Sequence, residues 1–146
     1  ISTIDLGLSD GIHTSSLGNV AIGHRAASTA LGGVFSRDVK FRHPDCIAAT
    51  RKSAKRIELQ FEHVDERLHF ESVIPDEFPF LVRDTQGEVQ IESWSIPKPD
   101  RFEIRLARPL QGKTVVIGAP GAFPPAVVPQ DISGHRPMLA FTQIVE

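Results

Sequence analysis

The heptapeptide RIELQFE, residues 56–62, decides how most of this sequence should fold. Its apolar side chains Ile57, Leu59 and Phe61 alternate with polar or charged ones. Strict alternation is typical of a half-buried β-strand, because successive side chains of a strand point to opposite faces. The stretch RFEIRL, residues 101–106, repeats the design. We therefore expect two strands that share one apolar face.

Further strand candidates lie on either side of these two segments. They cover residues 80–83, 88–96, 113–117 and 138–142. The sequence DTQG at residues 84–87 is typical of a hairpin turn. The proline-rich stretch 118–129 is expected to be a loop. Short strands punctuated by proline and glycine indicate an antiparallel β-sandwich-like region over residues 34–146.

The first 33 residues have a different pattern, which predicts a strand, a polar loop and a helix. The hydroxyl residues able to cap the helix N-terminus are Thr14, Ser15 and Ser16. The apolar residues at near-helical spacing, expected to form one buried face, are Leu17, Val20, Ala21, Ala27 and Leu31. Gly32-Gly33 is expected to end the helix. The sequence thus indicates two domains, residues 1–33 and 34–146.

Composition excludes several classes of function. The formal net charge of −2 gives no electrostatic footprint for nucleic acid or an anionic membrane. No apolar run approaches the ~20 residues of a membrane span, and we expect no signal peptide in this chain. The single cysteine, Cys46, excludes an internal disulfide and is expected to be a structural thiol. We expect a soluble protein and leave its compartment open, with secretion and the periplasm among the options.

Asp10-Gly11-Ile12-His13 is the strongest chemical signal in the chain. A serine hydrolase needs a hydroxyl that attacks, an imidazole that takes its proton, and a carboxylate that orients the imidazole. Three residues in a tight turn let an aspartate reach back to the histidine, and Gly11 supplies backbone freedom. The pattern predicts that Asp10 and His13 are catalytic.

The block DGIHTSSLG, residues 10–18, followed by a helix, resembles the last sequence block of the SGNH (GDSL-type) hydrolases. In that family a D-x-x-H block precedes the C-terminal helix of a flavodoxin-like α/β/α domain. The resemblance implies that His13 is the general base, that Asp10 is its partner, and that residues 1–33 are the C-terminal strand, loop and helix of such a domain.

The family's nucleophile block, Gly-Asp-Ser, and its oxyanion-hole blocks have no match in this sequence. The resemblance therefore implies that the serine and the oxyanion hole lie on a second polypeptide or a missing N-terminal part. Ile1 is not a start methionine, so we expect a chain processed by a cut upstream of Ile1, with the partner coming from the same gene product.

A β-rich region directly after the D-x-x-H helix is similar to the sialate O-acetylesterase type of carbohydrate esterase. This resemblance implies two-step hydrolysis of O-acetyl esters on a carbohydrate by a Ser-His-Asp mechanism. Neither a metal nor an organic cofactor is expected.

Two other interpretations stay open. The chain can be a non-catalytic carbohydrate-binding or interaction β-domain, with the first 33 residues as a structural arm. It can also be a small complete hydrolase that uses Ser9, Ser15 or Ser16, although no G-x-S-x-G nucleophile turn supports this.

A metal site is not favoured by the sequence. The group of candidate ligands is His63, Asp65, Glu66 and His69. Their spacing matches no standard zinc pattern, so we expect a solvated turn between strands at this point.

Overall fold

The two alternating segments pair with each other at the centre of one antiparallel sheet. In the computed structural model they form β2 (Arg56–Glu62) and β7 (Arg101–Leu106), with Leu59 opposite Phe102. The structure describes residues 1–10, 12–71, 78–121 and 127–146. Two further strands complete this sheet in the order β1-β2-β7-β6, namely β1 (Asp45–Ser53) and β6 (Ile91–Lys98).

A second antiparallel sheet faces the first and has the order β11-β8-β4-β5. Its strands are β4 (Phe80–Asp84), β5 (Gly87–Val89), β8 (Val115–Gly118) and β11 (Phe141–Ile144). A small third sheet has the order β10-β9-β3. Its strands are β3 (Leu68–His69), β9 (Gln130–Asp131) and β10 (Arg136–Pro137). Together these sheets form the β-domain.

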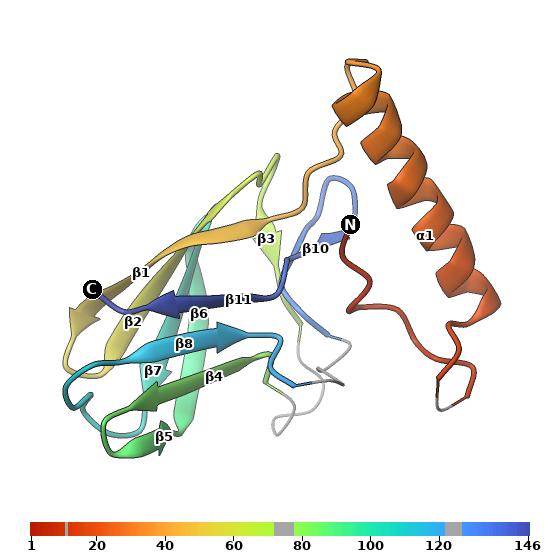
Figure 1. The fold of residues 1–146 in the computed structure, drawn as a ribbon. Helices are drawn as coiled ribbons and strands as arrows, with labels where there is room; N and C mark the ends of the chain where they lie inside the picture. The colour runs from red at the N-terminus through yellow and green to blue at the C-terminus, as the bar shows by residue number, and fades with distance from the viewer. Residues whose placement is uncertain (11, 72–77, 122–126) are drawn as a thin grey trace.

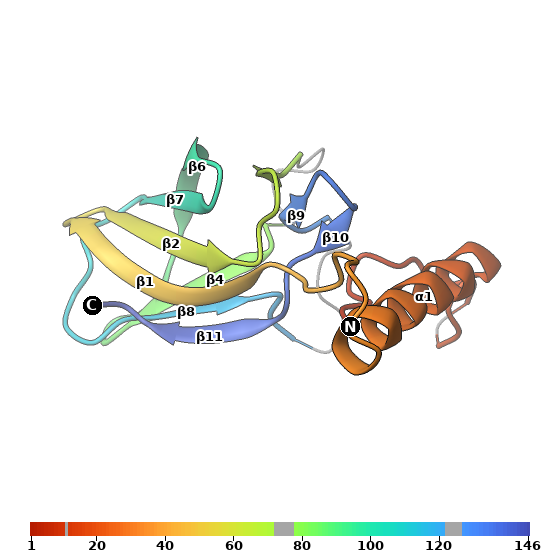
Figure 2. The ribbon, with the colours of Figure 1, turned by 90° about the horizontal axis from the view of Figure 1, so that it is seen from above.

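A seam between β1 and β11 joins the two larger sheets. A parallel bridge pairs Ala49 with Val145. Beside it the Arg51 N–H donates to the Glu146 carbonyl, and the Glu146 N–H donates to the Ala49 carbonyl at 3.0 Å. Figure 2 shows β1 and β11 side by side along this edge. The result is a β-sandwich-like fold that is continuous on one side.

Aromatic rings fill the space between the sheets. Phe102 is fully buried and lies 4.9 Å from Phe80 and 5.5 Å from Trp94, measured between ring centroids. Phe61 meets Phe141 edge to face at 5.9 Å. The Phe141 ring lies so close to Gly118 that a Cβ there would overlap it. The core therefore needs both the large rings and the missing side chain at residue 118.

The N-terminal residues form an arm beside the β-domain (Figure 1). Its helix α1 (Ser16–Thr29) is capped by Ser15, whose Oγ accepts from the Gly18 N–H at 3.0 Å. The helix does not stop at Gly32-Gly33 but continues as a π-helical turn, η1 (Ala30–Val34). Among the described residues, no helix has the length and apolarity that a bilayer crossing requires.

The prediction that residues 1–33 form part of a flavodoxin-like α/β/α domain is wrong. The described residues form antiparallel β-sheets with one α-helix, and α1 covers no sheet. No strand forms over residues 1–6, because this segment folds into turns held by other contacts. The Ser2 Oγ donates to the Met138 carbonyl, and the Asp5 carboxylate accepts from both terminal nitrogens of Arg25 at 2.6 and 2.7 Å.

The expected strands of the β-domain were found with local differences. The segment 88–96 is two strands, interrupted at Gln90, and the segment 138–142 yields a strand that begins three residues later, at Phe141. Strand β1 was not expected. The central part of the proline-rich stretch 118–129 lies outside the described residues.

Candidate catalytic pair

Asp10 and His13 lie in direct contact in the loop that precedes α1. The His13 Nδ1 is 2.8 Å from the Asp10 Oδ2. The other carboxylate oxygen, Oδ1, accepts from the Ile12 N–H at 2.9 Å and from the His13 N–H at 2.8 Å. Of the two residues between them, Gly11 lies outside the described residues. The aspartate thus fixes the turn with one oxygen and the imidazole with the other.

The hydrogen bonds to Asp10 keep this carboxylate ionised. The Ile12 N–H contributes most, followed by the His13 imidazole and the His13 N–H, and together they lower the pKa of Asp10 below its ordinary value. An ionised carboxylate only accepts hydrogen bonds, so the proton of a neutral His13 lies on Nδ1. The Nε2 lone pair is then free to accept a proton, as a general base requires.

The reactive side of the imidazole faces open space. The His13 side chain is 70% exposed, and within the described ranges no group hydrogen-bonds to Nε2. The Ser9 Oγ donates to the His13 carbonyl at 3.2 Å, and the Ser15 Oγ caps α1. Neither hydroxyl contacts the imidazole, and among the described residues no serine hydroxyl, that of Ser16 included, forms a hydrogen bond with it.

An apolar stripe runs along α1 and η1 from this loop. Its members follow one another at steps of three, eleven and three residues, close to one and three helical turns, so they share one face, and all are exposed: Leu17, Val20, Leu31 and Val34. We call this set the exposed stripe. The opposite side of the helix faces the N-terminal segment, where Gly18 is buried and Arg25 pairs with Asp5. The face that the sequence predicted to be buried is therefore uncovered in this chain.

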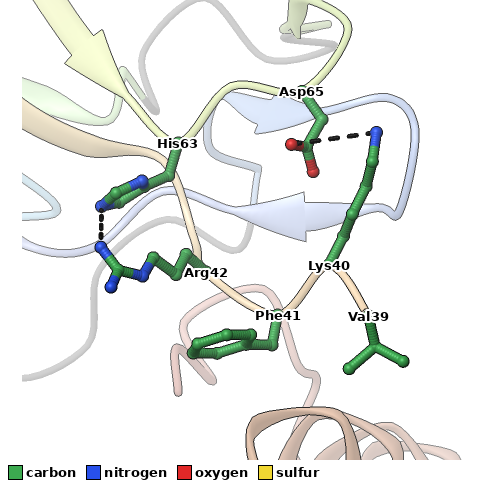
Figure 3. A pocket seen from close by; sticks show the side chains of 6 residues that line it. All are labelled: Val39, Lys40, Phe41, Arg42, His63 and Asp65. Atoms are coloured by element: carbon green, nitrogen blue, oxygen red, sulfur yellow. Dashed lines mark hydrogen bonds and ion pairs between the residues drawn. The ribbon is translucent and has the colours of Figure 1, made fainter. Parts of the chain in front are cut away.

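A second cluster of polar side chains lies at the other end of α1 (Figure 3). A hollow of about 200 Å³ is lined by Val39, Lys40, Phe41, Arg42, His63 and Asp65. The Arg42 Nη1 lies 3.2 Å from the His63 Nε2, and the Lys40 Nζ lies 3.8 Å from the Asp65 Oδ1. Sequence reasoning treated His63 as a turn residue and did not single out Arg42, because no motif connects segments 21 residues apart in the chain.

The structure also bears on two further candidates from the sequence, the Cys46 thiol and a metal site. Cys46 is buried, and burial raises the pKa of its thiol to about 12, which removes the thiolate that nucleophilic attack needs. The residues described here contain no group of three or more histidine, cysteine, aspartate or glutamate side chains placed to hold a metal ion.

No protein-family model matches the sequence, and no curated protein matches it. Among solved structures, the chain is similar to a carbohydrate acetylesterase from Xanthomonas citri, with a TM-score of 0.69 and 17% identity over 95% of this chain. It is also similar to the S-layer protein SbsC, with a TM-score of 0.55 and 13% identity over 88% of this chain.

These likenesses show the fold alone, since sequence identity is low. The chain spans 31% of the length of the acetylesterase and 16% of the S-layer protein. One fold therefore occurs as part of a longer esterase and as part of a longer surface-layer protein. Because the same fold occurs in both kinds of protein, the function has to be argued from the residues of the site and not from the fold.

Proposed function

We propose that this chain supplies the histidine and the aspartate of a serine esterase that removes acetyl groups from a carbohydrate. The observation that carries the proposal is the contact between His13 Nδ1 and Asp10 Oδ2 on an exposed loop, with Nε2 left accessible. The same two residue types at the same spacing form the last block of the SGNH hydrolases. The likeness to a carbohydrate acetylesterase supports the substrate class.

The reaction needs a serine from outside this chain. The serine oxygen attacks the acetyl carbonyl carbon while His13 Nε2 takes the hydroxyl proton. His13 then gives that proton to the departing sugar oxygen, which leaves an acetyl-enzyme. A water molecule attacks the acetyl-enzyme with its proton passing to His13, and acetate leaves as the serine regains a proton. Asp10 holds the imidazole in the required tautomer and stabilises its charged form.

The exposed stripe is the surface on which we place the serine-bearing unit. It starts at Leu17, four residues after His13, and Leu17 is 83% exposed. Large apolar side chains exposed on one face of a helix are typical of an interaction site. A unit bound to the stripe lies next to the His13 imidazole, because His13 is four residues before the first member of the stripe. That unit is either a second polypeptide or an upstream part of the same gene product.

The test compares acetyl ester hydrolysis by the native protein and three variants. His13→Ala and Asp10→Asn are each expected to lower kcat/KM for 4-nitrophenyl acetate by about 10³-fold or more. His135→Asn is the matched control, because His135 is an exposed histidine between β9 and β10, away from the stripe, and asparagine tolerates its left-handed backbone. Its activity should equal that of the native protein. All three should unfold at the native temperature, since the replaced side chains are exposed.

A fluorophosphonate probe identifies the unit that carries the serine. We expect the label on a separate polypeptide, or on an upstream part, that co-purifies with this chain. Full hydrolytic activity of His13→Ala would contradict the catalytic assignment, and so would a label on Ser9, Ser15 or Ser16.

A second candidate function is a non-catalytic β-domain of a cell-surface protein. The likeness to SbsC favours it, and in that case Asp10 serves only to fix the turn before α1. This alternative predicts neither hydrolysis nor probe labelling in any preparation. Both candidates agree with a location outside the cytoplasm, which the surface-layer likeness supports.

A further inference from the structure

His43 is a buried histidine at the junction between the arm and the β-domain. Only 5% of the residue is exposed. Its Nδ1 lies 2.9 Å from the carbonyl oxygen of Pro137, at the end of β10. A carbonyl only accepts hydrogen bonds, so Nδ1 donates to it. The proton of a neutral His43 is therefore on Nδ1, and Nε2 has a lone pair only.

The segment that His43 contacts also contacts the arm. The Leu139 N–H donates to the carbonyl of Pro44, the residue after His43, at 2.9 Å. The Ser2 Oγ of the arm donates to the Met138 carbonyl at 3.1 Å, and this contact is buried. Figure 1 shows the N-terminus of the arm beside β10. His43 and Ser2 therefore bind neighbouring carbonyls of one segment.

A hollow of about 270 Å³ gives solvent a path to this junction. His43 lines it together with residues of both parts of the molecule, namely Ile1, Thr29, Phe41, Arg42, Asp45, His63 and Leu139. Within the described ranges no group hydrogen-bonds to the His43 Nε2. A proton added to Nε2 would therefore be a buried donor without an acceptor, which is costly.

Positive groups from several elements also oppose a charge on His43. Burial is the main cause that lowers the pKa of His43 below its ordinary value, and the hydrogen bond to Pro137 offsets this only in part. The charges of Arg25 in α1, the Ile1 amine and Arg136 in β10 lower the pKa further. Both arginines already pair with carboxylates, so the folded junction favours a neutral imidazole.

Three further ionisable side chains line the hollow. Arg42 is another cation, and His63 lies between Arg42 and Glu62. Asp45 is the carboxylate among them, and in the part of the chain that the structure describes it forms neither a hydrogen bond nor an ion pair with His43. No anion in contact with His43 is thus described that would hold its charged form in place.

The arm is the part of the junction that can open at the lowest cost. Among the described residues up to 34, Ile4 is the one hydrophobic side chain that packs against the core. Segments with few buried apolar contacts open locally at a small free energy, while a packed core stays closed. Opening of the arm would expose the His43 imidazole and leave the β-domain folded.

We propose that His43 is a pH-sensitive link whose protonation in mild acid releases the arm from the β-domain. While the arm is docked, His43 stays neutral. In the open arrangement its imidazole reaches water and binds a proton with the ordinary pKa of about 6.5. Each pH unit below that value shifts the equilibrium toward the open arrangement by up to about tenfold, until the lowered pKa of the docked form is reached. This proposal does not depend on the proposed esterase function.

The test is amide hydrogen exchange of the full chain between pH 7.5 and pH 5.0, read by mass spectrometry and corrected for the intrinsic effect of pH on exchange. Exchange in residues 1–34 should accelerate by up to about tenfold per pH unit below about 6.5, because a free helix of 14 residues is only marginally stable. Residues 56–62 and 101–106, at the centre of the first sheet, should keep their protection.

Three variants show which histidine is responsible. His43→Asn keeps a side-chain donor for the Pro137 carbonyl but cannot take up a proton, so it should remove the acceleration. His135→Asn replaces an exposed histidine of the same junction and should keep the acceleration. His63→Asn replaces the other histidine of the hollow and should also keep it.

Several results would overturn the proposal. They are arm exchange that does not change with pH in the native chain, unchanged acceleration in His43→Asn, and loss of the acceleration in His63→Asn. If His43→Asn does not fold, the NMR signals of the His43 ring in the native chain decide. They should show protonation only together with the loss of arm protection, and a protonated His43 beneath a fully protected arm would contradict the proposal. His13→Ala should keep the pH response whatever the outcome of the esterase test.

Discussion

The β-domain and the arm use the same kinds of apolar residue in opposite ways. In the β-domain Leu59, Phe102 and Ile104 are completely buried. In the arm Leu17, Val34 and Phe35 are between 66% and 83% exposed. The apolar pattern of the β-domain is therefore satisfied within the chain, and that of the arm is not. The β-domain therefore buries the apolar side chains that stabilise the folded chain, whereas those of the arm remain available for the partner proposed above.

The way the arm is attached supports this division. Polar side-chain contacts join it to the β-domain, since the Ser2 Oγ donates to the Met138 carbonyl at 3.1 Å and the Arg25 Nη2 donates to the His135 carbonyl at 3.5 Å. Within the arm, Arg25 also holds the Asp5 carboxylate and the Ser2 carbonyl, which ties α1 to the N-terminal segment. These contacts orient α1 without burying the exposed stripe. The stripe thus stays available at a defined angle to the β-domain.

The largest expected effect comes from removing the same aromatic ring in each region. Phe102→Ala should lower the free energy of unfolding by about 3–5 kcal/mol, because it leaves a cavity in the centre of the aromatic cluster. Phe35→Ala makes the same chemical change on the exposed part of the arm and should stay within about 0.5 kcal/mol of the native value. Urea unfolding followed by tryptophan fluorescence measures both. Equal losses would mean that the arm has a packed core of its own.

An intermediate effect is expected from acid, through Asp84. This fully buried carboxylate accepts from the Arg108 guanidinium and from the N–H groups of Gln86 and Gln111, and the Arg108 contact is the main cause that lowers its pKa well below the ordinary value. The unfolded chain binds a proton more readily at this site. The stabilisation is therefore complete above the unfolded pKa of about 3.9 and is lost as the pH falls toward the folded value.

The corresponding experiment compares the native chain with Asp84→Asn at pH 7 and at pH 3. The variant should be less stable at pH 7, and its stability should fall less between the two pH values. Asp38→Asn is the control, because this carboxylate is exposed and has no hydrogen bond or ion pair among the described residues, so the pH dependence of unfolding should remain that of the native chain. A variant of Asp84 with the full native pH dependence would contradict the assignment.

The smallest effect on stability is expected on the exposed stripe. Val20→Glu should change the free energy of unfolding by less than about 0.5 kcal/mol, because Val20 is exposed and glutamate is a good helix former. Val82→Glu, at a fully buried position of β4, should prevent folding. Val20→Glu should instead abolish association with the serine-bearing unit, measured by co-elution. Retained association would move the partner's docking surface away from the stripe.

The strands that sequence reasoning found are those with strict alternation. Residues 56–62 and 101–106 alternate at every position and form β2 and β7 with those bounds. Strand β1 was not predicted, because CIAA at residues 46–49 is a continuous apolar run followed by polar residues and lacks strict alternation. Its strand conformation is stabilised by pairing with β2, which follows it after two residues, and by the contact with β11, which is remote in the sequence.

The arm was misjudged because its pattern fits a helix that packs on a sheet. Helical spacing alone says which residues share a face, and it does not say what covers that face. For the candidate site, the D-x-x-H spacing was enough to place Asp10 beside His13, since the contact is local. Their catalytic role stays a prediction. Arg42 and His63 could not be paired from sequence, because a positive φ at His63 and a ring seated on Gly32 are tertiary effects.

The seam between β1 and β11 bears on the kinetics of folding. It joins residues 45–53 to residues 141–146, so the edge that unites the two larger sheets forms only when remote segments of the chain meet. Contacts at such separation raise the contact order and slow folding to the millisecond-to-second range of sandwich-like proteins. During synthesis on a ribosome the first sheet can assemble early, but its β1 edge stays unpaired until residues 141–146 emerge.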